Sequence, residues 1–148
     1  MTYRVRSAEE HRTEIQAKAA AMGVDEAFIS TLVDSFYTRI RRDERLGPIF
    51  NNAIHDWDAH MPTMKAFWAS VALSTGQYSG KPVPSHMKLK GIEKTDFQIW
   101  LGLFHKTLED IAPSEAAITY FMQRADRIAA SLQLAMFGLP ELNSANHI

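Results

Sequence analysis

The chain has 148 residues, of which 46% are apolar and 22% charged, the balance of an ordinary globular protein with one domain. Its 16 lysine and arginine residues nearly cancel its 17 aspartate and glutamate residues, so the net charge gives no reason to expect nucleic acid or an anionic membrane as a partner. The chain contains no cysteine, which excludes disulfides, zinc–thiolate sites and thiol nucleophiles.

The first residues, MTYRVRSAEEHRTE, are charged and lack the apolar segment of a secretory signal. No apolar run approaches the length of about 18 residues that spans a bilayer. Together with the absence of cysteine, these features lead us to expect a reducing, cytoplasmic compartment.

Helical spacing recurs along the chain, and strand signals are nearly missing. Residues 8–21 are rich in helix formers, with Ser7 as a candidate N-cap and Gly23 as a stop. Their apolar face is thin, so we expect a peripheral helix. A second helix is predicted from Asp25 to about Arg42, with a regular apolar face of Ile29, Leu32, Val33, Phe36, Tyr37 and Ile40.

Pro48 then predicts only a brief turn, which carries Ile49 and Phe50. A third helix is predicted from about Asp56 to Leu73, and Pro62 near its start predicts a distorted first turn. One stripe of this helix consists of His60, Met64, Phe67, Trp68 and Val71.

Residues 75–93 show no helical period, and irregular stretches of that length in compact domains are usually functional. Within them, GKPVPSHMKLKG (80–91) places a single histidine, His86, between prolines and glycines that allow about one or two helical turns at most. This histidine is therefore a candidate for a role that depends on the orientation of its imidazole ring.

Two further helices are predicted. The first runs from about Lys94 to Ile111, with an apolar side of Phe97, Trp100, Leu101, Phe104 and Leu108. The second runs from about Ser114 to Phe137, with apolar positions Ile118, Phe121, Met122, Ile128, Leu132 and Met136. The prediction is an all-α, single-domain protein over 1–148, with an N-terminal extension and first helix (1–24), a core (25–137) and a polar tail (138–148).

The chain lacks the patterns of several common active sites. It has no HExxH and no pair of ExxH motifs for zinc or di-iron, no GxSxG elbow and no glycine-rich phosphate loop. Four of the six histidines lie on polar faces or in the tail, whereas His60 interrupts an apolar stripe and His86 lies in the irregular segment.

Two such histidines, combined with large aromatic residues on helices, suit a haem pocket with apolar walls and one imidazole on the iron. Tyr37, His60 and Trp100 each offer a hydrogen-bond donor on an apolar helix face, where a shared ligand would satisfy all three. The alternative is a cofactor-free helical interaction module, in which the same aromatic residues form an ordinary core.

The chain also resembles the truncated haemoglobins, and group III of that family best. The resemblance covers about residues 28–137 and rests on four stretches in family order: SFYTRIRRDERLGPIFNNAI (35–54), HMPTMKAFWA (60–69), PVPSHMKL (82–89) and FQIWLGLF (97–104).

The resemblance implies a globin-like two-over-two helical sandwich around haem b, iron protoporphyrin IX. In it, His86 matches the proximal iron ligand. The distal, ligand-facing residues it implies are Tyr37, His60 and Trp100. The remaining cofactor contacts it implies are Phe36 beside the distal tyrosine, and Phe50, Met64 and Trp68 in the pocket wall.

The function expected on this basis is binding of O2 and other diatomic ligands at haem iron. A ring of donors should slow O2 release, which suits scavenging, sensing, NO dioxygenation or peroxide reduction better than bulk delivery. We therefore expect O2, NO, CO or peroxide as ligands and a separate reductase as a partner. A dedicated haem peroxidase ranks lower, because the spacing of Arg39 and Arg41 does not place them on the face of Tyr37.

Overall fold

The computed structural model describes residues 7–75 and 89–138, and these form six α-helices. His86, the candidate iron ligand, lies outside the described residues. The helices are α1 (Ala8–Ala21), α2 (Glu26–Arg42), α3 (Leu46–Ala53), α4 (Trp57–Leu73), α6 (Asp96–Ile111) and α7 (Glu115–Phe137). The prediction of an all-α protein is confirmed.

Four of the helices begin where an oxygen-bearing side chain accepts a hydrogen bond from a backbone N–H of the first turn. Ser7 caps α1, Asp25 caps α2, Asp56 caps α4 and Ser114 caps α7. Such caps satisfy one of the N–H groups that a helix leaves without a partner. The predicted starts of these helices are thereby confirmed.

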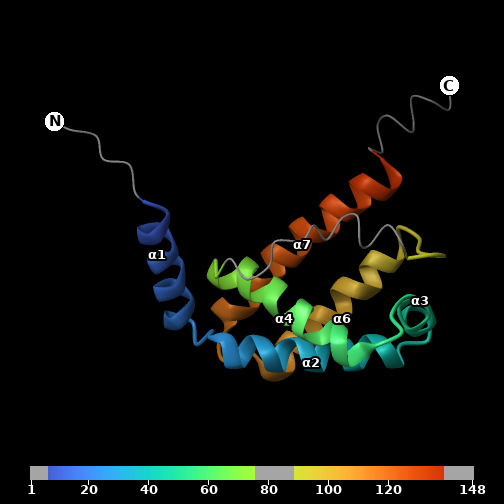
Figure 1. Cartoon of the computed structure of the whole chain (residues 1–148), viewed down its shortest axis with the longest axis horizontal. Helices are drawn as coiled ribbons and strands as arrows, with labels where there is room; N and C mark the ends of the chain where they lie inside the picture. The colour runs from blue at the N-terminus through green and yellow to red at the C-terminus, as the bar shows by residue number, and fades with distance from the viewer. Residues whose placement is uncertain (1–6, 76–88, 139–148) are drawn as a thin grey trace.

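The helices pack as two pairs, one laid over the other (Figure 1). Helix α2 packs against α4, α6 packs against α7, and α2 also contacts α6, which joins the pairs. The whole predicted apolar face of α2 is buried: Ile29, Leu32, Val33, Phe36, Tyr37 and Ile40. This arrangement is the two-over-two sandwich that the sequence led us to expect.

Helix α3 corrects the expectation of a brief turn at Pro48. It is a helix of eight residues that begins two residues before the proline. The carboxylate of Asp43 accepts hydrogen bonds from the backbone N–H groups of Arg45 and Leu46, at 3.0 and 2.8 Å. These bonds stabilise a helix start ahead of Pro48, which itself falls in the first turn, where a missing N–H costs nothing.

Helix α4 shows no distortion at its start, so that expectation was wrong. Its first turn is closed by a hydrogen bond from the His60 backbone N–H to the Asp56 carbonyl at 3.1 Å, and the helix continues through Pro62 to Leu73. The carbonyl that the proline leaves without an N–H belongs to Asp58, an exposed residue that water can reach.

The buried face of α7 differs from the one predicted. Of the predicted positions, Phe121 and Leu132 are buried, whereas Ile118, Met122, Ile128 and Met136 are only half-buried. The buried face is completed by small side chains and one tyrosine: Ala117, Tyr120, Ala125 and Ala129. Alanines let α7 lie close to its neighbours, and choosing positions by side-chain size overlooked them.

Helix α1 lies at one side of the molecule, where it contacts α4 (Figure 1). Ala19 is its one buried residue, and the Gln16 side-chain amide donates to the Leu73 carbonyl at the end of α4, at 3.1 Å. The prediction that this helix is peripheral is confirmed.

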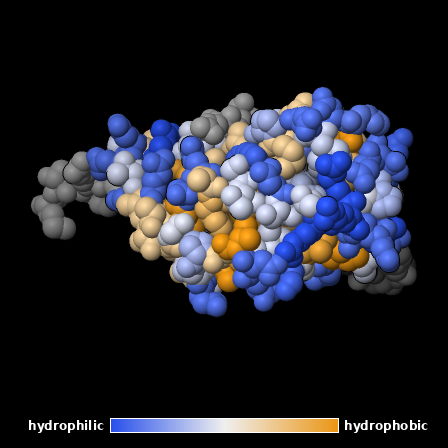
Figure 2. All heavy atoms as spheres, turned by 90° about the horizontal axis from the view of Figure 1, so that it is seen from below, coloured by the Kyte–Doolittle hydropathy of each residue, from blue (hydrophilic) through white to orange (hydrophobic). Residues whose placement is uncertain are grey.

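The surface is mostly hydrophilic in the view of Figure 2, with hydrophobic residues in scattered patches. In the described part of the chain, Leu134 is the large hydrophobic residue that is exposed, at 50%. No helix within residues 7–75 and 89–138 is long and apolar enough to cross a membrane.

Candidate functional site

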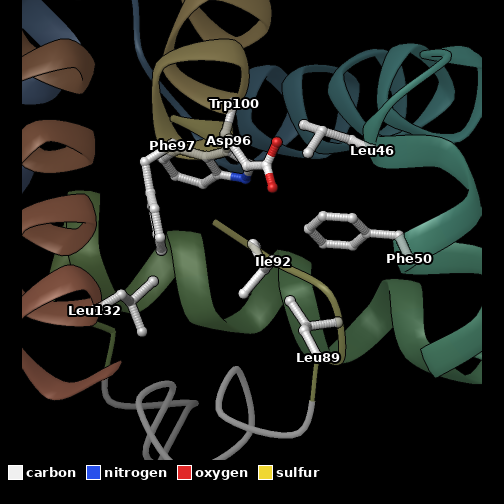
Figure 3. A pocket seen from close by; sticks show the side chains of 8 residues that line it. All are labelled: Leu46, Phe50, Leu89, Ile92, Asp96, Phe97, Trp100 and Leu132. Atoms are coloured by element: carbon white, nitrogen blue, oxygen red, sulfur yellow. The ribbon is translucent and has the colours of Figure 1, made fainter. Parts of the chain in front are cut away.

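A pocket opens where the start of α6 faces α3, the end of α7 and the chain that precedes α6 (Figure 3). Its walls are Leu46, Phe50, Leu89, Ile92, Asp96, Phe97, Trp100 and Leu132. All of these side chains except Asp96 are mainly apolar. The indole nitrogen of Trp100 faces the pocket. The free volume is about 10 Å³, roughly the space of one water molecule.

The single carboxylate of the pocket wall is neutralised by an arginine. Asp96 is 2% exposed, and the Arg45 guanidinium donates to both of its oxygens, each at 2.8 Å. Arg45 also donates to the Gly91 carbonyl at 2.7 Å, and the Glu93 backbone N–H donates to Asp96 at 2.7 Å. The hydrogen bonds from Arg45 lower the pKa of Asp96, so this carboxylate is charged at neutral pH.

Beside the pocket, Tyr37 of α2 lies buried against α4. Its side chain is 4% exposed, and burial raises the pKa of the phenol, so the hydroxyl remains protonated at physiological pH. The hydroxyl donates a hydrogen bond to Met64 Sδ at 3.3 Å. The Tyr37 ring contacts the ring of Phe50, a pocket residue, with centroids 6.5 Å apart.

His60 lies next to the same tyrosine, one helical turn before Met64 on α4. Its half-buried ring meets the edge of Tyr37 at 6.3 Å and of Trp57 at 6.0 Å between centroids. Trp57 is also in contact with Tyr37, at 5.8 Å. Two predicted donors, Tyr37 and His60, therefore lie side by side, in a cluster that adjoins the pocket.

Trp100, the third predicted donor, is linked to this cluster by Phe36, which contacts both Trp100 and Tyr37. The fully buried Phe36 ring packs edge-on against Tyr37 at 5.3 Å and against Trp100 at 5.4 Å. Trp68 lies deeper, stacked on Phe104 with centroids 4.9 Å apart. Phe36 and Trp68 thus support the wall from behind, whereas Phe50 and Trp100 line the pocket itself.

Two residues of this site were missed by the sequence reasoning. Nothing local in the sequence marks Asp96 as a pocket residue, because its arginine partner lies 51 positions away. Trp57 could have been predicted from the sequence, because a residue three positions before His60 lies on the same helix face as His60. Within residues 7–75 and 89–138, no three His, Asp or Glu side chains gather closely enough to hold a metal ion.

The two arginines near Tyr37 in sequence each have a partner other than Tyr37. Arg39 pairs with Asp110 on α6, and the Arg41 guanidinium lies 4.7 Å from the centre of the Trp57 ring. Neither contributes to the buried face of α2, in agreement with the spacing argument against a peroxidase-like arginine on the face of Tyr37.

The family model of the bacterial-like globins matches residues 20–134 of the chain. Among characterised proteins, the group 3 truncated haemoglobin ctb of Campylobacter jejuni is 36% identical over 118 residues, which are 77% of this chain and 92% of that protein. The crystal structure of the group III truncated haemoglobin from Campylobacter jejuni superposes with a TM-score of 0.72 at 35% identity, over the same shares of the two chains. The chain therefore belongs to the bacterial-like globins as a group III truncated haemoglobin, a family that binds diatomic ligands at haem.

Proposed function

We propose that this protein holds haem b in the pocket of Figure 3 and binds O2 or a related diatomic ligand beside Tyr37, His60 and Trp100. The observation that carries the proposal is a buried, protonated Tyr37 phenol whose ring contacts Phe50 of the pocket wall and whose hydroxyl donates to a weak acceptor, Met64 Sδ. A buried donor held by a weak acceptor gains from a stronger one, and a bound ligand with partial negative charge is such an acceptor.

The residues of the pocket fit the chemistry of the group. A porphyrin face needs apolar contacts, which Phe50, Phe97 and Leu132 supply, and the charge of Asp96 is already neutralised by Arg45. We assign the iron-binding imidazole to His86 because the SHMKL stretch of the chain resembles the proximal segment of the family. Bound haem would supply an iron centre able to take up diatomic ligands and to exchange electrons.

The free volume between the described residues of this pocket is about 10 Å³, far less than a macrocycle occupies. The same observation favours the alternative, a cofactor-free helical module, in which the aromatic residues are simply core. The two functions therefore differ in one measurable property, the stable uptake of haem.

For the physiological reaction, we propose oxygen chemistry such as NO dioxygenation or peroxide reduction in preference to O2 delivery. Three donors around one ligand favour slow O2 release. Turnover of either kind consumes electrons, which a separate reductase would provide. Tyr37, His60 and Trp100 would orient and stabilise the ligand, with O2, NO, CO and peroxide as the candidates.

Reconstitution with haem tests the proposal directly. The purified protein should acquire a Soret band with one haem per chain and melt at a higher temperature, because a ligand that binds the folded state stabilises it. His86→Ala should lose tight haem binding, whereas His55→Ala, a change at an exposed histidine, should bind haem as the unaltered protein does. A folded protein that takes up no haem would establish the cofactor-free alternative.

A further inference from the structure

The hydrogen bond between Tyr37 and Met64 has an unusual acceptor. A thioether sulfur accepts hydrogen bonds weakly, whereas a buried hydroxyl in a protein normally finds an oxygen or nitrogen. Here the hydroxyl lies 3.3 Å from Met64 Sδ, and both side chains are buried. The pair joins α2 to α4 beside the pocket residue Phe50.

The position of Met64 on α4 relates it to the candidate ligand site. Residues 60 and 64 are one turn apart, so His60 and Met64 lie on the same face and both approach Tyr37. The tyrosine ring is surrounded by ring contacts with Phe36, Phe50 and Trp57, whereas its hydroxyl hydrogen can turn about the C–O bond.

We propose that Met64 sets the strength of the hydrogen bond from Tyr37 to a diatomic ligand, because its sulfur competes with the ligand for the single hydroxyl proton. While the site is empty, the sulfur satisfies the hydroxyl. When a ligand with partial negative charge arrives, the hydroxyl exchanges a weak acceptor for a stronger one at little cost. Met64 is therefore a positioning residue that tunes ligand retention. This inference rests on the proposed haem function.

Substitution of Met64 by a residue without an acceptor should change how fast O2 dissociates. Met64→Leu keeps the size and apolar character but removes the acceptor, so the hydroxyl should turn to the ligand. We expect O2 to dissociate about two- to fivefold more slowly, the range of one modest hydrogen bond.

The CO complex gives a second measurement that does not depend on turnover. A donor close to the bound CO lowers the C–O stretching frequency, so Met64→Leu should shift the band down. In a Tyr37→Phe background, Met64→Leu should change neither the band nor the O2 dissociation rate. Met122→Leu, a half-buried methionine on α7, is the matched control and should leave both unchanged.

The outcomes separate this inference from the function on which it rests. Absence of a Soret band in the unsubstituted protein would defeat the haem function itself. A normal Soret band with the same C–O frequency and O2 release in Met64→Leu would overturn the role of Met64. An effect of Met64→Leu that persists in the Tyr37→Phe background would likewise overturn it, since the effect would then arise from pocket shape.

Discussion

Asp96 illustrates how a charged side chain comes to form part of an apolar pocket wall. Each of its two oxygens accepts a hydrogen bond from the Arg45 guanidinium. The Arg45 side chain is 44% exposed, so it stays partly hydrated. The pair also ties the chain at Gly91 and Glu93, ahead of α6, to the corner between α2 and α3. We infer that this pair fixes the side of the pocket at which α6 begins.

The pH dependence of stability should reveal this pair. The pKa of Asp96 lies below its ordinary value of 3.8 in the folded protein, so its contribution to stability is present above about pH 4 and is lost as the pH falls through the folded-state pKa. Asp96→Asn should therefore lower the urea midpoint at pH 7, and its difference from the unaltered protein should shrink below pH 4.

Asp126→Asn is the control for this experiment, because Asp126 is exposed on α7. It should leave the midpoint at pH 7 nearly unchanged, as surface substitutions usually do. An Asp96→Asn protein whose midpoint differs from the unaltered protein equally at pH 7 and pH 3 would show that packing, and not the charge, gives Asp96 its effect.

The sequence allowed some residues of the site to be predicted and not others. Tyr37 and Trp100 were identifiable because they interrupt or extend regular apolar helix faces, whereas Phe50 was identified through the family resemblance alone. Their partners were not, since the acceptor of the Tyr37 hydroxyl depends on how α2 crosses α4. The bond from Arg45 to Asp96 likewise depends on where the α2–α3 corner meets the start of α6.

At the scale of elements, the short helix α3 places two pocket residues, Leu46 and Phe50, and its position depends on a glycine. A Cβ on Gly47 would lie 2.7 Å from the backbone carbonyl oxygen of Arg41, closer than such atoms approach. Backbone, unlike a flexible side chain, cannot move aside cheaply. Helix α3 can therefore lie this close to the end of α2 only with glycine at position 47.

Substituting the two helical glycines separately tests this packing. Gly47→Ala should destabilise the fold by about 1–3 kcal/mol, the usual cost of inserting a methyl group into a packed site. Gly102→Ala, in α6, meets nothing within 4 Å and should stabilise the fold by about 0.5–1 kcal/mol through helix propensity. Urea unfolding measures both, and a neutral Gly47→Ala would contradict the close approach of α3 to α2.

Helix boundaries were more predictable than helix faces. Caps such as Asp25 and Ser114 are local signals, and they marked the starts correctly. The face of α7 was misassigned because burial follows the neighbouring helix and not side-chain size, so Ala125 and Ala129 are buried where Ile128 is only half-buried. Periodicity therefore predicts that a helix exists more reliably than which side faces the core.

At the scale of the molecule, most of α1 lies outside the stretch that the family model matches. The family match covers residues 20–134, which leaves most of α1 outside it. The helix nevertheless supplies a hydrogen bond to the last turn of α4 and buries Ala19. We infer that α1 stabilises the end of α4 without belonging to the candidate site.

Removal of residues 1–21 tests this division. Among the described residues of this stretch, the Gln16 hydrogen bond and the buried Ala19 methyl group are lost, which should lower the free energy of unfolding by about 1–2 kcal/mol. Haem uptake, measured by the Soret band, should persist. Gln16→Ala in the full chain is the matched control and should show about half of the effect. If the shortened chain folds but takes up no haem, α1 contributes to the site after all.

The sequence by itself determined the helical class, most helix boundaries, the buried face of α2 and the family, because these depend on local caps, on periodicity and on residues in a fixed order. Only the tertiary structure decided which side chains meet: Tyr37 with Met64, Arg45 with Asp96, and Phe50 with Trp100 in one pocket wall. These side-chain contacts depend on how helices far apart in the chain cross each other, a property that no local pattern of residues encodes.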